Sequence, residues 1–173
     1  FFYCLILLIT ICAVFACTGM APKEQVIGSD NCYLVDFNSG RVLYAKGEND
    51  KKPIASMVKI MTLLITFENV DSGKLSLDQK VTISHEAAAQ VGSEMFLDEG
   101  VEYPLSDLIK GIVTMSANDA SVAVAELIGG DEVAFTGMMN QRAAALGMND
   151  TLFSNATGYP TKEEQYSTAK DVA

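Results

Sequence analysis

The residues that many hydrolases and metal proteins rely on are scarce in this sequence. His85 is the only histidine, which excludes a chymotrypsin-like triad, and its neighbours Ser84 and Glu86 suit the exposed first turn of a helix. Three of the four cysteines lie before residue 18, so Cys32 stands alone in the rest of the chain. A single cysteine forms no intramolecular disulfide, and no Cys-x-x-Cys pair is present to bind zinc. A disulfide scaffold is therefore excluded.

Positive charge is also in short supply. Lys and Arg number 12 against 22 Asp and Glu, which gives a formal net charge of −10. The basic residues are scattered, whereas a protein that binds nucleic acid gathers them into a patch that neutralises phosphates. This balance excludes nucleic-acid binding as the function.

Residues 1–22 contain no charged side chain, and residues 1–16 are almost wholly apolar. Such a segment resembles the hydrophobic region of a signal peptide or a short membrane anchor. The chain begins with Phe1 rather than Met and lacks a basic leader, so we expect its true start to be missing. Val14-Phe15-Ala16 offers a cleavage site, while lipidation of Cys17 remains an alternative. The segment predicts an exported, extracytoplasmic protein of the cell envelope, with membrane association left open.

Residues 23–173 are expected to form part of one domain. Alternating apolar and polar residues predict a β-hairpin over 32–46 that turns at Asn38-Ser39-Gly40. From Ser56 to about Val70 the chain is apolar on nearly every face, which predicts a buried central helix. Further helices are predicted over 85–91, 107–115, 119–128 and 131–146, with Ser84, Ser106 and Asp131 as N-caps and Ser167 capping a short last helix.

A hairpin followed by helices indicates an α/β chain of the α+β type. Two strands alone are marginal in water and need partners. We therefore expect further strands after residue 173.

The pair Ser56 and Lys59 carries the strongest chemical signal. Residues three apart share a helix face, so the Ser56 hydroxyl and the Lys59 amine can meet across one turn. At the helix N-terminus, Ser56 also has an unpaired backbone N–H in the positive end of the helix dipole. Burial in an apolar run lowers the pKa of a lysine amine, and a neutral Lys59 could take the serine proton. The competing interpretation is a helix cap beside a lysine that reaches solvent.

Ser116 and Asn118 fall at the break between two of the predicted helices. A hydroxyl and a carboxamide two residues apart can face one cleft, where the hydroxyl would pass a proton to a leaving amine and the amide would hold a substrate carbonyl. Helix capping by either residue is the alternative. A second Ser-x-x-Lys, from Ser167 to Lys170, lacks the apolar helix and is interpreted as a cap with a surface lysine.

Together these segments resemble the low-molecular-mass D-alanyl-D-alanine carboxypeptidases, penicillin-binding proteins of the β-lactamase/transpeptidase superfamily. The resemblance covers residues 32–173 and implies an antiparallel sheet packed with helices. Besides Ser56-x-x-Lys59 and Ser116-x-Asn118, it rests on these segments: Arg41-Val42-Leu43-Tyr44, Pro53-Ile54-Ala55, Gly92-Ser93-Glu94-Met95-Phe96-Leu97, Asp119-Ala120, Met139-Asn140, Leu146-Gly147-Met148, Phe153-Ser154-Asn155-Ala156-Thr157-Gly158 and Tyr166-Ser167-Thr168-Ala169-Lys170-Asp171.

The resemblance implies a serine peptidase that removes the terminal D-Ala from peptidoglycan pentapeptide stems through an acyl-enzyme, and that β-lactams acylate. It makes Ser56 the nucleophile, Lys59 the general base, Ser116 a proton relay and Asn118 a substrate-binding residue. The Ser56 N–H would be one donor of the oxyanion hole. No metal and no organic cofactor is implied.

The third motif of the superfamily, Lys-Thr-Gly or Lys-Ser-Gly, does not occur in these 173 residues. We therefore expect an incomplete catalytic domain, cut before that motif and inactive on its own. A β-lactamase or transpeptidase of the same superfamily remains an alternative, as does a non-catalytic peptidoglycan-binding remnant. A class A β-lactamase is disfavoured, because no glutamate lies between Glu132 and Glu163 to serve deacylation.

Overall fold

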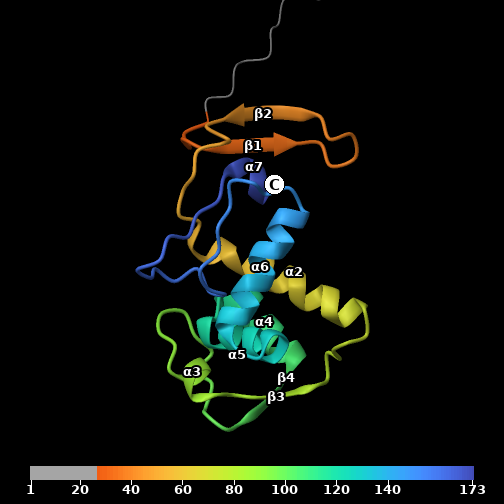
Figure 1. The fold of residues 1–173 in the computed structure, drawn as a ribbon, viewed down its shortest axis with the longest axis vertical. Helices are drawn as coiled ribbons and strands as arrows, with labels where there is room; N and C mark the ends of the chain where they lie inside the picture. Colours follow the sequence, from red (N-terminus) through yellow and green to blue (C-terminus); the bar gives the residue numbers. More distant parts are fainter. Residues whose placement is uncertain (1–26) are drawn as a thin grey trace, which may run out of the picture. The chain divides into compact units, whose positions relative to one another are not determined.

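The computed structural model describes residues 27–173, of which Asn31–Ala173 form one compact unit. The predicted signal or anchor segment, 1–22, lies outside the described residues. No helix within 27–173 is long and apolar enough to cross a membrane. The elements, drawn in Figure 1, are in chain order β1 (Cys32–Val35), β2 (Val42–Lys46), the 3-10 turn η1 (Ala55–Met57), α2 (Val58–Asp71), β3 (Lys80–Thr82), α3 (His85–Ala88), β4 (Glu102–Pro104), α4 (Leu105–Met115), α5 (Asn118–Gly129), α6 (Glu132–Ala145) and α7 (Ala169–Val172).

Two small antiparallel sheets confirm the predicted α+β class. β1 pairs with β2 in the register Tyr33 to Ala45, which confirms the predicted hairpin. β3 pairs with β4 in the register Val81 to Tyr103, and neither strand was predicted. Each of these two strands has only three residues, which is too short for alternation of apolar and polar side chains to be recognised.

Helix α5 joins two apolar cores. One core surrounds α3, α4 and β3, and α5 supplies Ala120, Val122, Ala123 and Val124 to it. The other lies between α2 and α6, where Ala125 of α5 packs with Phe135 and Met139. Burial runs without interruption from Asn118 to Ala125, because the small side chains of this stretch let neighbouring elements approach from every side. The N-terminus of α5 is thereby held rigidly.

Helix α2 is buried on one face only, which corrects the prediction of a helix buried all round. Val58, Met61 and Ile65 lie in the core, whereas Ile60 is 57% exposed and Phe67 is 43% exposed. The difference arises because α5 and α6 pack on one side of α2 and leave the other side uncovered in the described part of the chain.

Two of the predicted N-caps are confirmed. The Ser84 hydroxyl accepts from the Ala87 N–H at 2.9 Å, and the Asp131 carboxylate accepts from the Ala134 N–H at 2.7 Å. Each side chain satisfies a backbone donor that has no partner inside its own helix.

The caps predicted at Ser106 and Ser167 are wrong. Helix α4 begins at Leu105, and the first N–H groups of this helix donate instead to the carbonyls of Leu77 and Gln79. Helix α7 is capped by Thr168, whose hydroxyl accepts from the Asp171 N–H at 3.0 Å. At α4 the partners come from a distant part of the chain, which local sequence does not reveal, whereas at α7 the cap falls one residue later than predicted.

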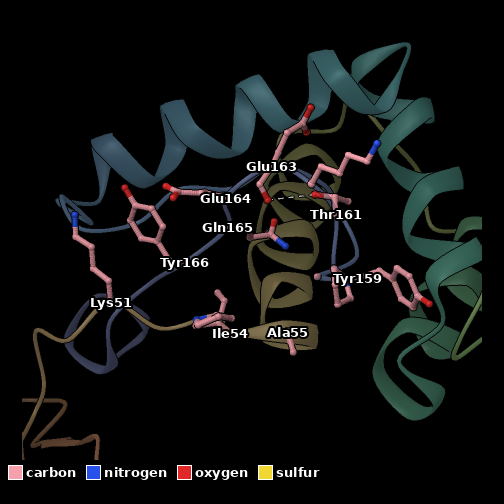
Figure 2. A pocket seen from close by; sticks show the side chains of 13 residues that line it. Lys51, Ile54, Ala55, Tyr159, Thr161, Glu163, Glu164, Gln165 and Tyr166 are labelled. Atoms are coloured by element: carbon pink, nitrogen blue, oxygen red, sulfur yellow. Dashed lines mark hydrogen bonds between the residues drawn. The ribbon is translucent and has the colours of Figure 1, made fainter.

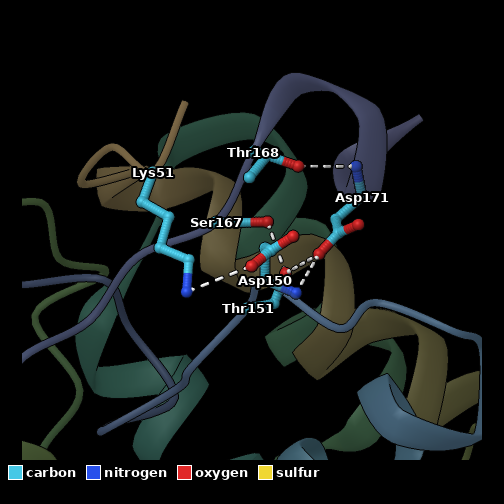
Figure 3. Close-up of polar contacts among 6 residues, drawn as sticks. All are labelled: Lys51, Asp150, Thr151, Ser167, Thr168 and Asp171. Carbon is cyan, nitrogen blue, oxygen red and sulfur yellow. Dashed lines mark hydrogen bonds and ion pairs between the residues drawn. The ribbon is translucent and has the colours of Figure 1, made fainter. Parts of the chain in front are cut away.

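A polar cluster fixes the last residues of the chain (Figure 3). The Asp171 carboxylate accepts from the Asp150 N–H at 2.9 Å and from the Thr151 hydroxyl at 2.8 Å. Lys51 forms an ion pair with Asp150 at 3.1 Å, and Lys52 exchanges backbone hydrogen bonds with Ser167. This cluster sets the path of the chain just before η1.

The buried carboxylate of Asp119 anchors the loop before β4. Asp119 is 1% exposed, and its oxygens accept from the backbone N–H groups of Met95, Leu97 and Ala120 at 2.8 to 3.1 Å. Phe96, between two of these donors, has a left-handed backbone with φ of 59°. A bulky residue occupies that conformation only where the surroundings enforce it.

We expect Asp119→Asn to lower the free energy of unfolding by about 2 to 3 kcal/mol, because the amide presents a donor to buried N–H groups that then lack an acceptor. Chemical denaturation measures this loss. Asp107→Asn is the matched control, since Asp107 is half exposed and forms a surface ion pair with Lys110, so its loss stays below about 1 kcal/mol. Equal losses for the two variants would contradict the anchoring role.

Candidate active site

The site begins at a strained turn that carries Ser56. Ala55 has a left-handed backbone with φ of 45°, and the 3-10 turn η1 follows directly. Ser56 is exposed. In the first turn of a helix the backbone N–H groups precede the first intrahelical acceptor, so the Ser56 N–H is available to a ligand.

The Lys59 amine lies at the centre of the site. Its side chain is 4% exposed, and Nζ lies 2.8 Å from Asn118 Oδ1, 2.6 Å from the Thr157 carbonyl oxygen and 3.4 Å from Ser56 Oγ. Burial lowers the pKa of Lys59 to about 8, because a buried ammonium loses its hydration. A lysine with this pKa is neutral in part of the molecules at neutral pH, and a neutral amine can accept a proton.

Asn118 is held from both ends of its amide. Its Oδ1 accepts from Lys59, while its Nδ2 donates to the Val91 carbonyl at 2.6 Å. The Asn118 N–H donates to the Ser93 carbonyl at 2.7 Å. Gly92, with φ of 96°, allows this approach, since a Cβ there would lie 3.1 Å from Asn118 Nδ2. The orientation of the carboxamide is therefore set by its neighbours.

Ser116 ends α4 in a left-handed conformation with φ of 57°. Its Oγ is buried and has no hydrogen-bond partner within residues 27–173. A buried hydroxyl without a partner is uncommon and costs free energy unless a ligand or water satisfies it. The structure therefore brings Ser56 and Asn118 each into contact with Lys59, while Ser116 lies two residues from Asn118 and bonds to none of them.

A turn over residues 155–158 completes the site, and sequence reasoning assigned it no role. It supplies the Thr157 carbonyl that accepts from Lys59. Gly158, with φ of 78°, packs so tightly that an added Cβ would lie 1.9 Å from the Ala55 carbonyl oxygen. Asn155 and Gly158 are residue types that signal a turn, but nothing in the sequence indicates which carbonyl faces the lysine.

A pocket of about 640 Å³ adjoins the turn that carries Ser56 (Figure 2). Figure 2 shows Ala55 at the beginning of the helix, and the segment from Tyr159 to Tyr166 lies around the same hollow with Lys51 at its far side. The pocket therefore lies beside Ala55, the residue that precedes Ser56.

The other sequence candidates stay outside the site. The Ser167 hydroxyl hydrogen-bonds with Thr151 and Lys170 is exposed, so the second Ser-x-x-Lys is structural, although its predicted cap is supplied by Thr168. His85 is exposed, as predicted, and the nearby Glu99 raises its pKa. Within the described residues, no group of three or more His, Cys, Asp or Glu side chains could hold a metal ion.

Comparison with known proteins identifies the class to which this fold and site belong. The profile of the D-alanyl-D-alanine carboxypeptidase family, peptidase family S11, matches residues 18–173. The chain belongs to this family.

Individual relatives agree with that assignment. D-alanyl-D-alanine carboxypeptidase DacF of Bacillus subtilis is 42% identical over 155 residues, which cover 90% of this chain and 40% of the relative. The crystal structure of D-alanyl-D-alanine carboxypeptidase DacD from Francisella tularensis superposes with a TM-score of 0.86 at 38% identity, covering 89% of this chain and 37% of that one. Penicillin-binding protein D2 from Listeria monocytogenes, solved in an ampicillin-bound form, gives 0.75 at 27% identity over 87% of this chain and 60% of that one. The chain thus spans about 40% of the length of its curated relative.

We expect Gly158→Ala to destabilise the protein more than the same change at Gly100. Both glycines have similar positive φ values, 78° and 75°, but a Cβ at Gly100 meets nothing within 4 Å. The backbone penalty alone is about 1 to 2 kcal/mol, and at Gly158 the collision with the Ala55 carbonyl adds at least about 1 kcal/mol. Denaturant titration of both variants checks this difference. Equal losses of unfolding free energy in the two variants would show that the turn at Gly158 can shift to accept a Cβ without displacing Ala55.

Proposed function

We propose that this protein is a serine-type D-Ala-D-Ala carboxypeptidase that removes the terminal D-Ala from peptidoglycan pentapeptide stems through an acyl-enzyme. The observation that carries the proposal is the environment of the Lys59 amine, which contacts Ser56, Asn118 and Thr157 at once. Membership of the carboxypeptidase family supports the substrate class.

The hydrogen bonds of the Lys59 amine favour proton transfer from Ser56 to Lys59. A neutral amine has two N–H donors and one lone pair. The two short contacts, to Asn118 Oδ1 and the Thr157 carbonyl, are to acceptors and use both donors. The lone pair is then left for the Ser56 hydroxyl, at 3.4 Å, a separation that substrate binding would shorten.

Acylation would follow from this arrangement. Ser56 Oγ attacks the carbonyl carbon of the bond between the two D-Ala residues as its proton passes to Lys59. The Ser56 N–H stabilises the developing oxyanion as one of its donors. Asn118 orients the substrate peptide, and the Ser116 hydroxyl, which has no partner within residues 27–173, relays a proton from Lys59 to the departing D-Ala amine.

Deacylation would return the enzyme to its starting state. Water attacks the ester on Ser56, and the serine recovers its proton. A β-lactam would acylate the same oxygen, which agrees with the ampicillin-bound form of the Listeria neighbour. Peptidoglycan lies outside the cytoplasm, and we propose that residues 1–22 direct the protein there as a signal peptide or membrane anchor.

The first test is covalent labelling of the intact protein by a fluorescent penicillin. We expect Ser56→Ala to abolish labelling, because the variant lacks the attacking oxygen. Ser167→Ala, which alters the other Ser-x-x-Lys, should retain labelling per folded molecule. Labelling that persists in Ser56→Ala would refute the nucleophile assignment, and rapid release of the label would favour a β-lactamase. Muropeptide binding without acylation would favour a non-catalytic remnant.

The second test is the pH dependence of acylation. Because the pKa of Lys59 is about 8, the neutral base becomes more abundant as pH rises, so the rate constant should increase about tenfold per pH unit below 8 and level off above it. Stopped-flow labelling between pH 6 and 9.5 measures this, with circular dichroism to confirm that the fold persists. A midpoint near 6.5 or near 10.5 would contradict a buried lysine base.

A further inference from the structure

Asn155 organises the turn beneath the candidate site. It is 6% exposed, and its Oδ1 accepts from the Thr157 N–H at 3.1 Å, from the Gly158 N–H at 2.7 Å and from the Thr157 hydroxyl at 3.2 Å. Its Nδ2 donates to the Tyr159 carbonyl at 2.9 Å. One carboxamide therefore closes the turn in the way typical of Asn side chains that bond to backbone groups two and three residues on.

One of the peptide groups that Asn155 holds, the one between Thr157 and Gly158, touches the reacting residues. Thr157 presents its carbonyl to Lys59 Nζ at 2.6 Å. Gly158 lies against the Ala55 carbonyl and close to the Ser56 N–H, since a Cβ on Gly158 would be 3.0 Å from Ser56 N. The geometry of the turn is thus transmitted to the base and to the nucleophile.

Other contacts hold a different part of the turn. The Thr62 hydroxyl donates to the Ala156 carbonyl at 2.8 Å, and the Glu132 carboxylate accepts from the Ala156 N–H at 2.9 Å. The Thr62 bond also fixes the peptide between Ala156 and Thr157. The N–H of the next peptide, which carries the Thr157 carbonyl, donates to Asn155.

We infer that Asn155 is a positioning residue for acylation, which aims the Thr157 carbonyl at Lys59 and seats Gly158 against the backbone of Ala55. This inference rests on the proposed function of Ser56 and Lys59. With the carbonyl in place, one amine hydrogen is committed to Thr157 and the lone pair is directed at Ser56. Without it, the amine is free to rotate and water can reach it.

The test compares Asn155→Ala and Asn155→Ser with the wild type in the intact protein. Two readouts are the penicillin acylation rate as a function of pH and the Lys59 pKa, measured by NMR titration of the lysine side chain. We expect Asn155→Ala to acylate about 100-fold more slowly at pH 7, the order expected for a misplaced catalytic group. The Lys59 pKa should rise above about 8, because burial is what lowers it and the opened turn admits water.

Asn155→Ser should lie between Asn155→Ala and the wild type, since a serine hydroxyl can close the same turn more weakly. If Asn155→Ala does not fold, the acylation rate and the Lys59 pKa of Asn155→Ser test the inference without it. The carboxylates of Glu132 and Asp119, which hold the segments around the site, bond to backbone N–H groups rather than to Lys59 and are unchanged in every variant.

Asn140→Ala is the matched control. Asn140 also holds the chain just before this turn, because its side chain exchanges hydrogen bonds with the backbone of Phe153 at 2.9 Å. It forms no hydrogen bond with the turn over 155–158 or with Lys59. Its loss should lower stability and leave the Lys59 pKa at the wild-type value. The inference is overturned if the pKa and the pH midpoint of acylation are unchanged in Asn155→Ala and Asn155→Ser. A wild type that is not acylated refutes the proposed function, while the NMR titration still decides whether Asn155 governs the amine.

Discussion

The structure depends on the burial of one amine among three oxygen atoms. A lysine side chain that is 4% exposed loses the hydration of its ammonium, and the fold offers it Asn118 Oδ1, the Thr157 carbonyl and Ser56 Oγ instead. These oxygens come from η1, the start of α5 and the turn over 155–158. Each segment must therefore be placed to within a fraction of an ångström, and much of the surrounding architecture serves that placement.

The segments around this amine are rigidly packed, and some of them have a strained backbone. The N-terminus of α5 lies between two apolar cores and cannot move independently of them. Three non-glycine residues in the described chain, Ala55, Phe96 and Ser116, have positive φ values. Ala55 directly precedes Ser56 and Ser116 lies two residues before Asn118, so two of the three adjoin candidate catalytic groups. Such strain persists only where tertiary contacts enforce it, and it clusters at functional sites.

Local signals predicted the elements well where the chain itself supplies the partners. The hairpin, the caps at Ser84 and Asp131 and the approximate extent of α5 follow from alternation, capping chemistry and helix-stop glycines. The cap expected at Ser106 was wrong, because the Leu77 and Gln79 carbonyls accept from the first N–H groups of α4. The cap expected at Ser167 was wrong, because Thr168 caps α7 one residue later. The strands β3 and β4 were missed because each has three residues, too few to show an alternation of apolar and polar side chains.

By itself the sequence determined the pairing of Ser56 with Lys59, because residues three apart on a helix share a face whatever surrounds them. It also determined the acidic charge and the lack of a histidine-based triad. Only the tertiary structure decided that Lys59 is buried, that its other partners come from 59 and 98 residues away, and that Asn155 aims one of them. Burial and the direction of a backbone carbonyl depend on long-range packing, and no local pattern of side chains encodes them.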